Sequence, residues 1–372
     1  MTEQAMGLYV HIPWCVRKCP YCDFNSHPAR GELPVDDYVD ALLRDLSAQL
    51  EALPTTRIGT VFFGGGTPSL FPPAAFARVL EHLGERIAPQ AEITMEANPG
   101  TTEHGDLKGY RLAGINRLSF GAQSFNEAHL IALGRIHDPQ AIYRSFDLAR
   151  AAGFDNVNLD LMYGLPRQTR DEALADLDAA ITLAPEHVSW YQLTLEPKTE
   201  FARRPPPLPS DLMLAATEDA GYEKLDRAGF GRYEVSAFAR AGRRCRHNLG
   251  YWTFADYLGV GAGAHGKLST GLPLTVRRTR KAHQPRVYLA DPVTTVTEAL
   301  DPGVLPGEFM LNALRLVDGV ELERFVVATG LPLEALEPAR SRQIANGLLE
   351  PDRLAATRRG FALLDSLIQD YL

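Results

Sequence analysis

Residues 11–27 read HIPWCVRKCPYCDFNSH and hold three of the four cysteines of this chain. Cys15, Cys19 and Cys22 follow the spacing C-x3-C-x2-C, with Pro20 inside the group. Because proline breaks a helix, we predict a loop here rather than one helical face. Three thiols are too many for one disulfide and one short of a closed tetrahedral metal site. The spacing therefore predicts a loop that wraps an ion or a cluster and leaves one position open.

Two kinds of metal site fit three thiolates. A zinc ion would need His11 or His27 as its fourth ligand, but structural zinc usually takes its ligands from two separated pairs, and none are seen here. Iron–sulfur clusters take thiolate ligands, and a cubane cluster has four irons. Three cysteines would hold three of them and leave the fourth iron free for another ligand. We therefore predict a [4Fe–4S] cluster at Cys15, Cys19 and Cys22.

The bulk composition sets the context of this site. The 372 residues are 45% hydrophobic and 23% charged, which is typical of globular proteins. The sequence has no apolar run of about 18 residues and no signal peptide pattern, so we expect no integral membrane segment. Few cysteines, three of them clustered, favour the reducing cytoplasm, with peripheral membrane attachment left open. The net charge of -8 indicates no nucleic-acid partner, and the basic run VRRTRK at 276–281 is predicted to be a solvated loop.

Apolar runs alternate with helical periodicity through the first half of the chain. We predict strands at LYVHI (8–12), TVFFGG (60–65), EITMEA (92–97), RLSFGA (117–122), NVNLDL (156–161) and VSWYQLTL (188–195). Segments such as 36–53 and 141–153 repeat with helical periodicity between them. This alternation predicts an α/β fold with parallel strands. Six units are fewer than the eight of a complete TIM barrel, so we expect a partial (β/α)6 barrel with polar loops at the carboxyl ends of its strands.

After about residue 200 the alternation weakens. The proline-rich RRPPPLPS at 203–210 is predicted to be an extended connection, and short helical segments dominate from about 295. We predict a barrel core at 1–235, a sheet extension at 236–294, and a small C-terminal domain at 295–372 that is mainly helical and resembles a winged helix.

The cysteine spacing after a first strand, with Tyr21 just before the last cysteine, resembles the signature of the radical S-adenosylmethionine (SAM) superfamily. The resemblance implies that the open iron of the cluster chelates the amino and carboxylate groups of SAM. It also implies that a reduced cluster passes an electron to SAM and cleaves it to a 5′-deoxyadenosyl radical. Sequence features in the expected order extend the resemblance over essentially the whole chain.

Positions that match SAM-binding residues lie at successive strand ends. Glycines in FFGGGTPS allow close backbone approach, and carboxylates at strand ends can accept hydrogen bonds, although a plain turn or a cap explains each feature taken alone. In the coproporphyrinogen-oxidase-like branch of the superfamily, the matching residues are Tyr9, Tyr21, Gly65, Gly66, Thr67, Glu96, Gln123, Arg135 and Asp160. Asp160 is suited to ribose hydroxyls. The resemblance therefore implies an intact SAM pocket.

Two departures argue against one activity of this branch. The oxygen-independent coproporphyrinogen III oxidases carry a further cysteine two residues after the last cluster cysteine, where this chain has Phe24. Those oxidases also have a substantial segment before the first strand, whereas here the strand begins by about Leu8. Oxidative decarboxylation of coproporphyrinogen is therefore the alternative prediction rather than the first.

A second motif, H-N-x-x-Y-W, lies in CRHNLGYW at 245–252 and indicates haem. An imidazole beside two aromatic rings can serve as an axial ligand with flat apolar walls, although packing of a loop is the plain alternative. The haem candidates are His247, Asn248, Tyr251 and Trp252, with Cys245 as another possible axial ligand. Arg243, Arg244 and Arg246 are suited to the propionates.

The H-N-x-x-Y-W motif is similar to the hallmark of the HemW-type haem chaperones. The resemblance implies a haem chaperone that binds haem, a [4Fe–4S] cluster and SAM, and that passes haem to an acceptor protein, with respiratory haem proteins as the expected class. It leaves a homodimer open. The sequence identifies no certain catalytic residue, although SAM cleavage is compatible with the superfamily.

Overall fold

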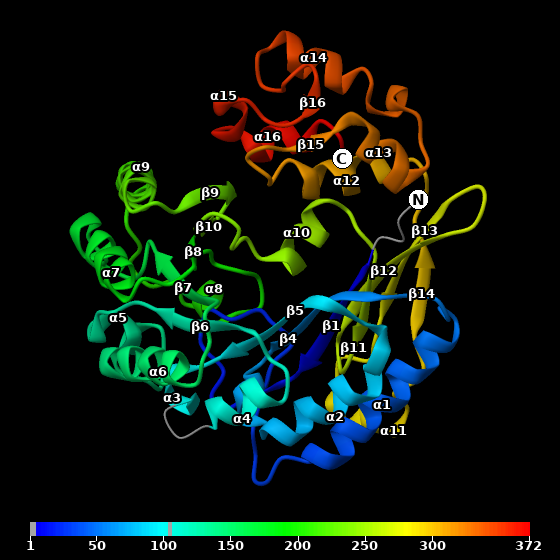
Figure 1. The fold of residues 1–372 in the computed structure, drawn as a ribbon. Helices are drawn as coiled ribbons and strands as arrows, with labels where there is room; N and C mark the ends of the chain where they lie inside the picture. The colour runs from blue at the N-terminus through cyan, green and yellow to red at the C-terminus, as the bar shows by residue number, and fades with distance from the viewer. Residues whose placement is uncertain (1–4, 103–105) are drawn as a thin grey trace.

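One twisted sheet organises the molecule (Figure 1). The computed structural model describes residues 5–102 and 106–372. Within these residues the largest sheet has 12 strands in the order β14-β13-β12-β11-β1-β4-β5-β6-β7-β8-β10-β9. Its central part consists of the parallel strands β1, β4, β5, β6, β7 and β8. The predicted α/β class and partial (β/α)6 barrel are therefore confirmed.

The six parallel strands coincide with the six predicted apolar runs. They are β1 (Met6–Ile12), β4 (Ile58–Gly65), β5 (Ile87–Ala97), β6 (Arg117–Gln123), β7 (Val157–Tyr163) and β8 (His187–Gln192). The helices on the outer face include α1 (Val35–Glu51), α2 (Pro73–Leu83), α4 (Leu107–Leu112), α6 (Pro139–Ala151) and α7 (Arg170–Leu183). Local signals set their ends: Asp138 caps α6 by accepting from the N–H of Ala141, and Pro139 occupies its first turn.

The two faces of the parallel strands differ in chemistry because successive side chains alternate between them. Apolar side chains point outward to the helices, as where the rings of Phe63 and Phe76 meet with centroids 4.9 Å apart. The inward positions are largely polar. They include Thr60, Glu92, Glu96, Arg117, Ser119, Asn158, Asp160, His187 and Tyr191. The interior of the partial barrel is thus lined by hydrogen-bonding groups rather than filled by an apolar core.

The extension continues the sheet beyond β1. Strand β11 (Tyr257–Val260) runs parallel to β1, and β12 (His265–Thr270), β13 (Thr275–Arg280) and β14 (Val296–Ala299) follow antiparallel. The prediction that VRRTRK forms a solvated loop is wrong, since most of it is β13. Its backbone pairs with two neighbours, and Arg278 forms an ion pair with Glu308.

The C-terminal region packs above the interior of the sheet and has its own apolar core (Figure 1). It contains α12 (Leu305–Ala313), α13 (Leu322–Thr329), α14 (Ala339–Ala345), α15 (Arg358–Phe361), α16 (Leu364–Gln369) and the paired strands β15 (Val320–Glu321) and β16 (Arg353–Leu354). The predicted helical C-terminal region is confirmed, whereas the three domain boundaries stay a prediction. In the part of the chain described here, no helix is long and apolar enough to cross a membrane.

Candidate functional site

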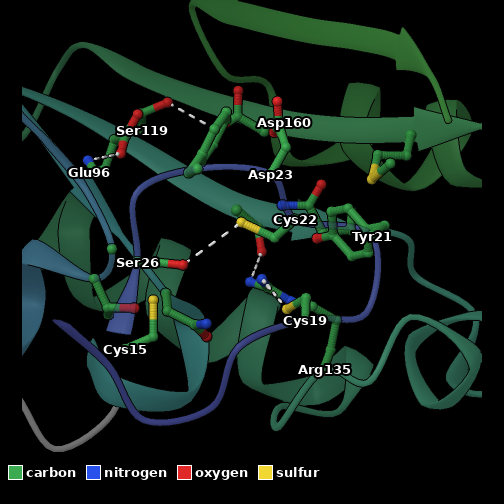
Figure 2. A pocket seen from close by; sticks show the side chains of 18 of the residues that line it. Cys15, Cys19, Tyr21, Cys22, Asp23, Ser26, Glu96, Ser119, Arg135 and Asp160 are labelled. Atoms are coloured by element: carbon green, nitrogen blue, oxygen red, sulfur yellow. Dashed lines mark hydrogen bonds between the residues drawn. The ribbon is translucent and has the colours of Figure 1, made fainter. Parts of the chain in front are cut away.

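The cysteine loop is closed at its base by a short parallel pair, β2 (Trp14–Cys15) and β3 (His27–Pro28). Figure 2 shows its three thiols around one space. The thiol sulfur of Cys22 lies 3.8 Å from Oγ of Ser26, and that of Cys19 lies 3.7 Å from Nη1 of Arg135. Burial raises the pKa of Cys15 and of Cys22. A cationic metal centre would favour the thiolates instead, and Arg135 already supplies positive charge beside Cys19.

The thiols line a cavity of about 450 Å³ at the carboxyl ends of the parallel strands, which we call the cysteine cavity. It brings together all but one of the residues predicted to bind the cluster and SAM: Cys15, Cys19, Cys22, Tyr21, Gly65, Gly66, Thr67, Glu96, Gln123, Arg135 and Asp160. Parallel strands gather their terminal side chains at one edge, as predicted. The cavity thus combines thiol donors with carboxylate, amide and guanidinium groups.

Glu96, at the end of β5, is held in an unusual protonation state. Its Oε2 accepts a hydrogen bond of 3.0 Å from the backbone N–H of Gly65. Burial, and secondly the charge of Asp160, raise the pKa of Glu96 to about 8, although the Gly65 N–H opposes this shift. At neutral pH the side chain is therefore largely protonated. A cationic ligand group beside it would favour the carboxylate.

Asp160, on β7, is fixed by neighbours that the sequence did not indicate. Its Oδ2 accepts 3.0 Å from the Ser119 hydroxyl, and its Oδ1 accepts 2.8 Å from the amide nitrogen of Asn158. Burial raises the pKa of Asp160, and these hydrogen bonds oppose the shift. Ser119 lies on the adjacent strand β6 and Asn158 lies two residues before Asp160 on β7, so all three side chains share one face of the sheet.

The end of β6 is shaped by a backbone conformation that is rare for residues other than glycine. Gln123 has a φ of +67°, and its Oε1 accepts 2.9 Å from the hydroxyl of Tyr191. Arg135 donates 2.6 Å from Nη2 to the carbonyl of Gly121, while its buried Nε has no hydrogen-bond partner among the described residues. The Arg135 guanidinium is thus held at the end of β6 with one buried donor still unsatisfied.

The glycines of FFGGGTPS serve the packing of two loops. A Cβ on Gly66 would lie 2.4 Å from the carbonyl oxygen of Trp14, and one on Gly65, whose φ is +115°, would lie 2.4 Å from the ring of His11. The N–H of Thr67 also donates 2.7 Å to the carbonyl of Trp14. These glycines therefore hold the end of β4 against the base of the cysteine loop, in addition to lining the cavity.

Tyr9 and His11 lie beneath the cysteine cavity, and neither lines it. The Tyr9 hydroxyl lies 2.9 Å from Nδ1 of His11, whose Nε2 lies 2.9 Å from the carbonyl oxygen of Asn25. Burial lowers the pKa of His11 to about 4, so the ring is neutral. Tyr9 is thus placed to support the cysteine loop rather than to face a ligand. Because both nitrogens of His11 are engaged, the ring is not free to complete a zinc site.

The H-N-x-x-Y-W motif forms α10 (Arg246–Trp252), which Figure 1 shows between the sheet and the C-terminal helices. Glu92 accepts hydrogen bonds of 3.1 Å from the backbone N–H groups of both Arg246 and His247. The thiol of Cys245 lies 3.6 Å from the same carboxylate. Burial raises the pKa of Cys245 to about 12, so its thiol is protonated. Cys245 therefore anchors the start of α10 in this arrangement and is not presented as an axial ligand.

His247 is inserted into the barrel interior, where it is buried and neutral. Its Nδ1 lies 2.8 Å from Oγ1 of Thr60 and its Nε2 lies 2.7 Å from the hydroxyl of Tyr251, while its ring stacks on Phe62 with centroids 5.1 Å apart. Burial, with Arg117 as a second cause, lowers the pKa of His247 to about 3. In this structure the ring therefore fills space between β4 and α10, with both of its nitrogens engaged.

Two adjoining cavities flank this helix. The α10 cavity, of about 290 Å³, is lined by residues that include His247, Tyr251 and Arg246. The Trp252 cavity, of about 160 Å³, is lined by residues that include Trp252 and Tyr251, which is common to both. Asn248 lines neither cavity.

The fold and the cysteine cavity define a protein of the radical SAM superfamily, whose sequence profile matches residues 9–180. The profile of the HemN C-terminal domain matches residues 300–363. The heme chaperone HemW of Escherichia coli is 45% identical over 99% of this chain and 98% of its own, and that of Mycobacterium tuberculosis is 36% identical over 100% and 96%. The chain belongs to the family of the heme chaperone HemW. The coproporphyrinogen III oxidase HemN of Escherichia coli has the same fold, with a TM-score of 0.80 and 22% identity over 99% of this chain and 90% of the oxidase.

Proposed function

We propose that this protein is a haem carrier that binds haem at α10, holds a [4Fe–4S] cluster and SAM in the cysteine cavity, and passes haem to an acceptor protein. The observation that carries the proposal is the full-length likeness to relatives named heme chaperone, in a chain whose H-N-x-x-Y-W motif borders two cavities. Respiratory haem proteins are the acceptor class that we expect, in the reducing cytoplasm. Association of two copies of this chain into a homodimer stays part of the proposal.

The haem site that we propose uses the aromatic walls of the α10 and Trp252 cavities. The rings of Tyr251 and Tyr257 meet edge to face with centroids 4.6 Å apart, and both cavities border them. Aromatic faces suit a flat macrocycle because they bury apolar area without a large entropy cost. His247 is the first candidate for the axial ligand, provided that its Nε2 exchanges the Tyr251 hydroxyl for iron.

Cations near α10 could pair with the haem propionates. Arg243 forms an ion pair of 3.3 Å with Asp155, and Arg244 forms one of 3.2 Å with Asp318. Both pairs are partly exposed, and such pairs contribute little free energy, so these arginines can exchange partners. Arg246 donates to the carbonyl of Gln90 and lines the α10 cavity directly. It is therefore the arginine that we expect to contact a propionate first.

The cysteine cavity fits the cofactors that the superfamily implies, because three thiols, the carboxyl groups of Glu96 and Asp160, and the Arg135 side chain line one space. We propose that Cys15, Cys19 and Cys22 hold the cluster, which would supply one-electron reduction chemistry to bound SAM. Asp160 would accept hydrogen bonds from ribose hydroxyls. The other proposed SAM contacts are Tyr21, Gly65, Gly66, Thr67, Glu96, Gln123 and Arg135, with Tyr9 in support.

The alternative activity, oxidation of coproporphyrinogen, has less support. Phe24 stands where the oxidases carry a further cysteine, and its exposed ring borders the mouth of the cysteine cavity. A phenyl ring can neither donate a hydrogen atom from sulfur nor bind metal as a thiolate does. The likeness of fold to HemN concerns the scaffold and not the reaction.

An anaerobic titration with haemin tests the proposal. Cluster-reconstituted protein should bind about one haem per chain at saturation, with a Soret band distinct from that of free haemin. Conversion of coproporphyrinogen in the presence of SAM and a reductant should stay at the level of a control without protein. Haem absorbance that rises without saturation, or turnover of coproporphyrinogen, would contradict the proposal.

A further inference from the structure

A chain of hydrogen bonds crosses the barrel interior between the two proposed sites. It begins at α10, where the backbone N–H of Cys245 donates 3.2 Å to the hydroxyl oxygen of Tyr233. That hydroxyl lies 2.8 Å from Nε2 of His187, and Nδ1 of the same ring lies 2.6 Å from Oδ1 of Asn158. The amide nitrogen of Asn158 then donates 2.8 Å to Oδ1 of Asp160. Five groups from four segments thus join the motif helix to the cysteine cavity.

The direction of every link follows from the donors available. Asn158 donates from its amide nitrogen to both Asp160 and Ser119, so its oxygen must accept from Nδ1–H of His187. The Nε2 of a neutral His187 then accepts from the hydroxyl of Tyr233. Burial, and secondly Arg117, lower the pKa of His187 well below its usual value, so the ring is neutral as this pattern requires. All donors in the chain therefore point from α10 toward Asp160.

The chain of hydrogen bonds is isolated from water. Asn158, His187, Tyr233 and Cys245 are each no more than 2% exposed. Buried hydrogen bonds without competing water polarise one another, and losing one partner leaves the other group unsatisfied. A movement of the group at either end must therefore change the other hydrogen bonds of the series.

A second contact path runs from the same helix toward the cysteine loop. The ring of His247 stacks on Phe62, which in turn lies 6.3 Å from the ring of Tyr9 between centroids. The Tyr9 hydroxyl contacts His11, which bonds to Asn25 of the cysteine loop. Tyr9 thus lies on a contact path between α10 and the cysteine loop.

We propose that the buried chain couples the two sites, so that SAM held at Asp160 changes the affinity of α10 for haem, with Tyr233 as the positioning residue that fixes the start of α10. The inference rests on the proposed function, since it requires haem at α10. Coupling between two binding sites is reciprocal: haem must change the affinity for SAM by the same factor. Tyr233 is the link to test because its hydroxyl both accepts from Cys245 and donates to His187.

The test measures two dissociation constants in cluster-reconstituted full-length protein under anaerobic conditions. Haemin is titrated with and without saturating SAM, and SAM is titrated by equilibrium dialysis with and without saturating haemin. In the wild type, each ligand at saturation should change the dissociation constant of the other by the same factor, about fivefold or more. In Tyr233→Phe this factor should fall toward one. The dissociation constant of each ligand measured without the other should change by a smaller factor.

Tyr110→Phe is the matched control. Tyr110 is equally buried, and its hydroxyl donates 2.6 Å to the carbonyl of Phe71, away from the chain. This variant also loses one buried hydroxyl, so it should keep the wild-type coupling factor. A factor of one in the wild type, or a factor unchanged by Tyr233→Phe, would overturn the inference while haem binding stands. Absence of saturable haem binding would instead overturn the proposed function, and the inference with it.

Discussion

The hydroxyl oxygen of Tyr251 lies 2.7 Å from Nε2 of His247, and Oγ1 of Thr60 lies 2.8 Å from Nδ1 of the same ring. Both nitrogens of the proposed axial ligand are thus satisfied inside the protein. Iron can bind Nε2 only if the Tyr251 hydroxyl moves away. At the proposed haem site, the tyrosine of the H-N-x-x-Y-W motif would therefore compete with haem for the histidine of the same motif.

Tyr251→Phe removes this competitor and keeps the aromatic ring. One hydrogen bond contributes about 1 kcal/mol, so we expect haem to bind about fivefold more tightly to this variant in an anaerobic haemin titration. His247→Ala should weaken binding and shift the Soret band. Weaker haem binding in Tyr251→Phe, as in His247→Ala, would mean that the hydroxyl contributes to haem binding. It would contradict the competition between that hydroxyl and haem iron for Nε2 of His247.

Asp160→Asn should weaken the binding of SAM. The substitution keeps the size of the side chain but removes the charge that ribose hydroxyls would meet, and hydrogen bonds to charged groups contribute about 1.5–3 kcal/mol. We expect a loss of affinity of roughly tenfold or more by equilibrium dialysis. Asp155→Asn, at an aspartate that pairs with Arg243 near the surface, is the matched control and should bind SAM normally. Equal losses in both variants would argue against a SAM contact at Asp160.

The raised pKa of Glu96 makes the stability of the cofactor-free protein depend on pH. An unfolded glutamate ionises near its ordinary value of 4.5, whereas the folded one does so near about 8. Between these values the folded state binds more protons, so the free energy of unfolding falls as pH rises and levels off above about 8. Glu96→Gln should flatten this dependence. Melting temperatures measured from pH 5 to 8 test it, and an unchanged slope in the variant would refute the assignment to Glu96.

The extension is joined to the barrel by a buried ion pair. Nζ of Lys281 lies 2.5 Å from Oδ1 of Asp45, and both side chains are almost fully buried. Removing one partner of such a pair costs about 3–5 kcal/mol, because the other charge stays buried and unpaired. Lys281→Met should therefore lower the free energy of unfolding in urea by this amount, and Lys281→Met with Asp45→Leu should lose less. Equal losses in the single and the double variant would mean that packing, not charge, dominates the contribution of this pair to stability.

The fold and the cysteine cavity were largely predictable because their signals are local. Each strand carries its own apolar run, and Cys15, Cys19 and Cys22 lie within eight residues. The matching strand ends then bring Glu96, Gln123 and Asp160 to one edge of the sheet, as parallel topology requires.

The surroundings of α10 were not predictable from local pattern. Glu92 and Cys245 meet across 153 positions of sequence, and Tyr233 meets His187 across 46. No periodicity encodes such pairs. For the same reason the arginines of VRRTRK indicated a loop, although the neighbouring strands β12 and β14 supply the backbone partners of β13.

The central claim is that haem and the cluster occupy separate sites in one carrier. Anaerobic haemin titration of the wild type and of Cys15→Ala, Cys19→Ala and Cys22→Ala, with Cys245→Ala as the control, tests it most directly. We predict that the first three variants lose the brown iron–sulfur absorbance and still bind haem saturably near one per chain, whereas Cys245→Ala keeps the cluster. Loss of haem binding together with the cluster in each of the three variants would contradict the account.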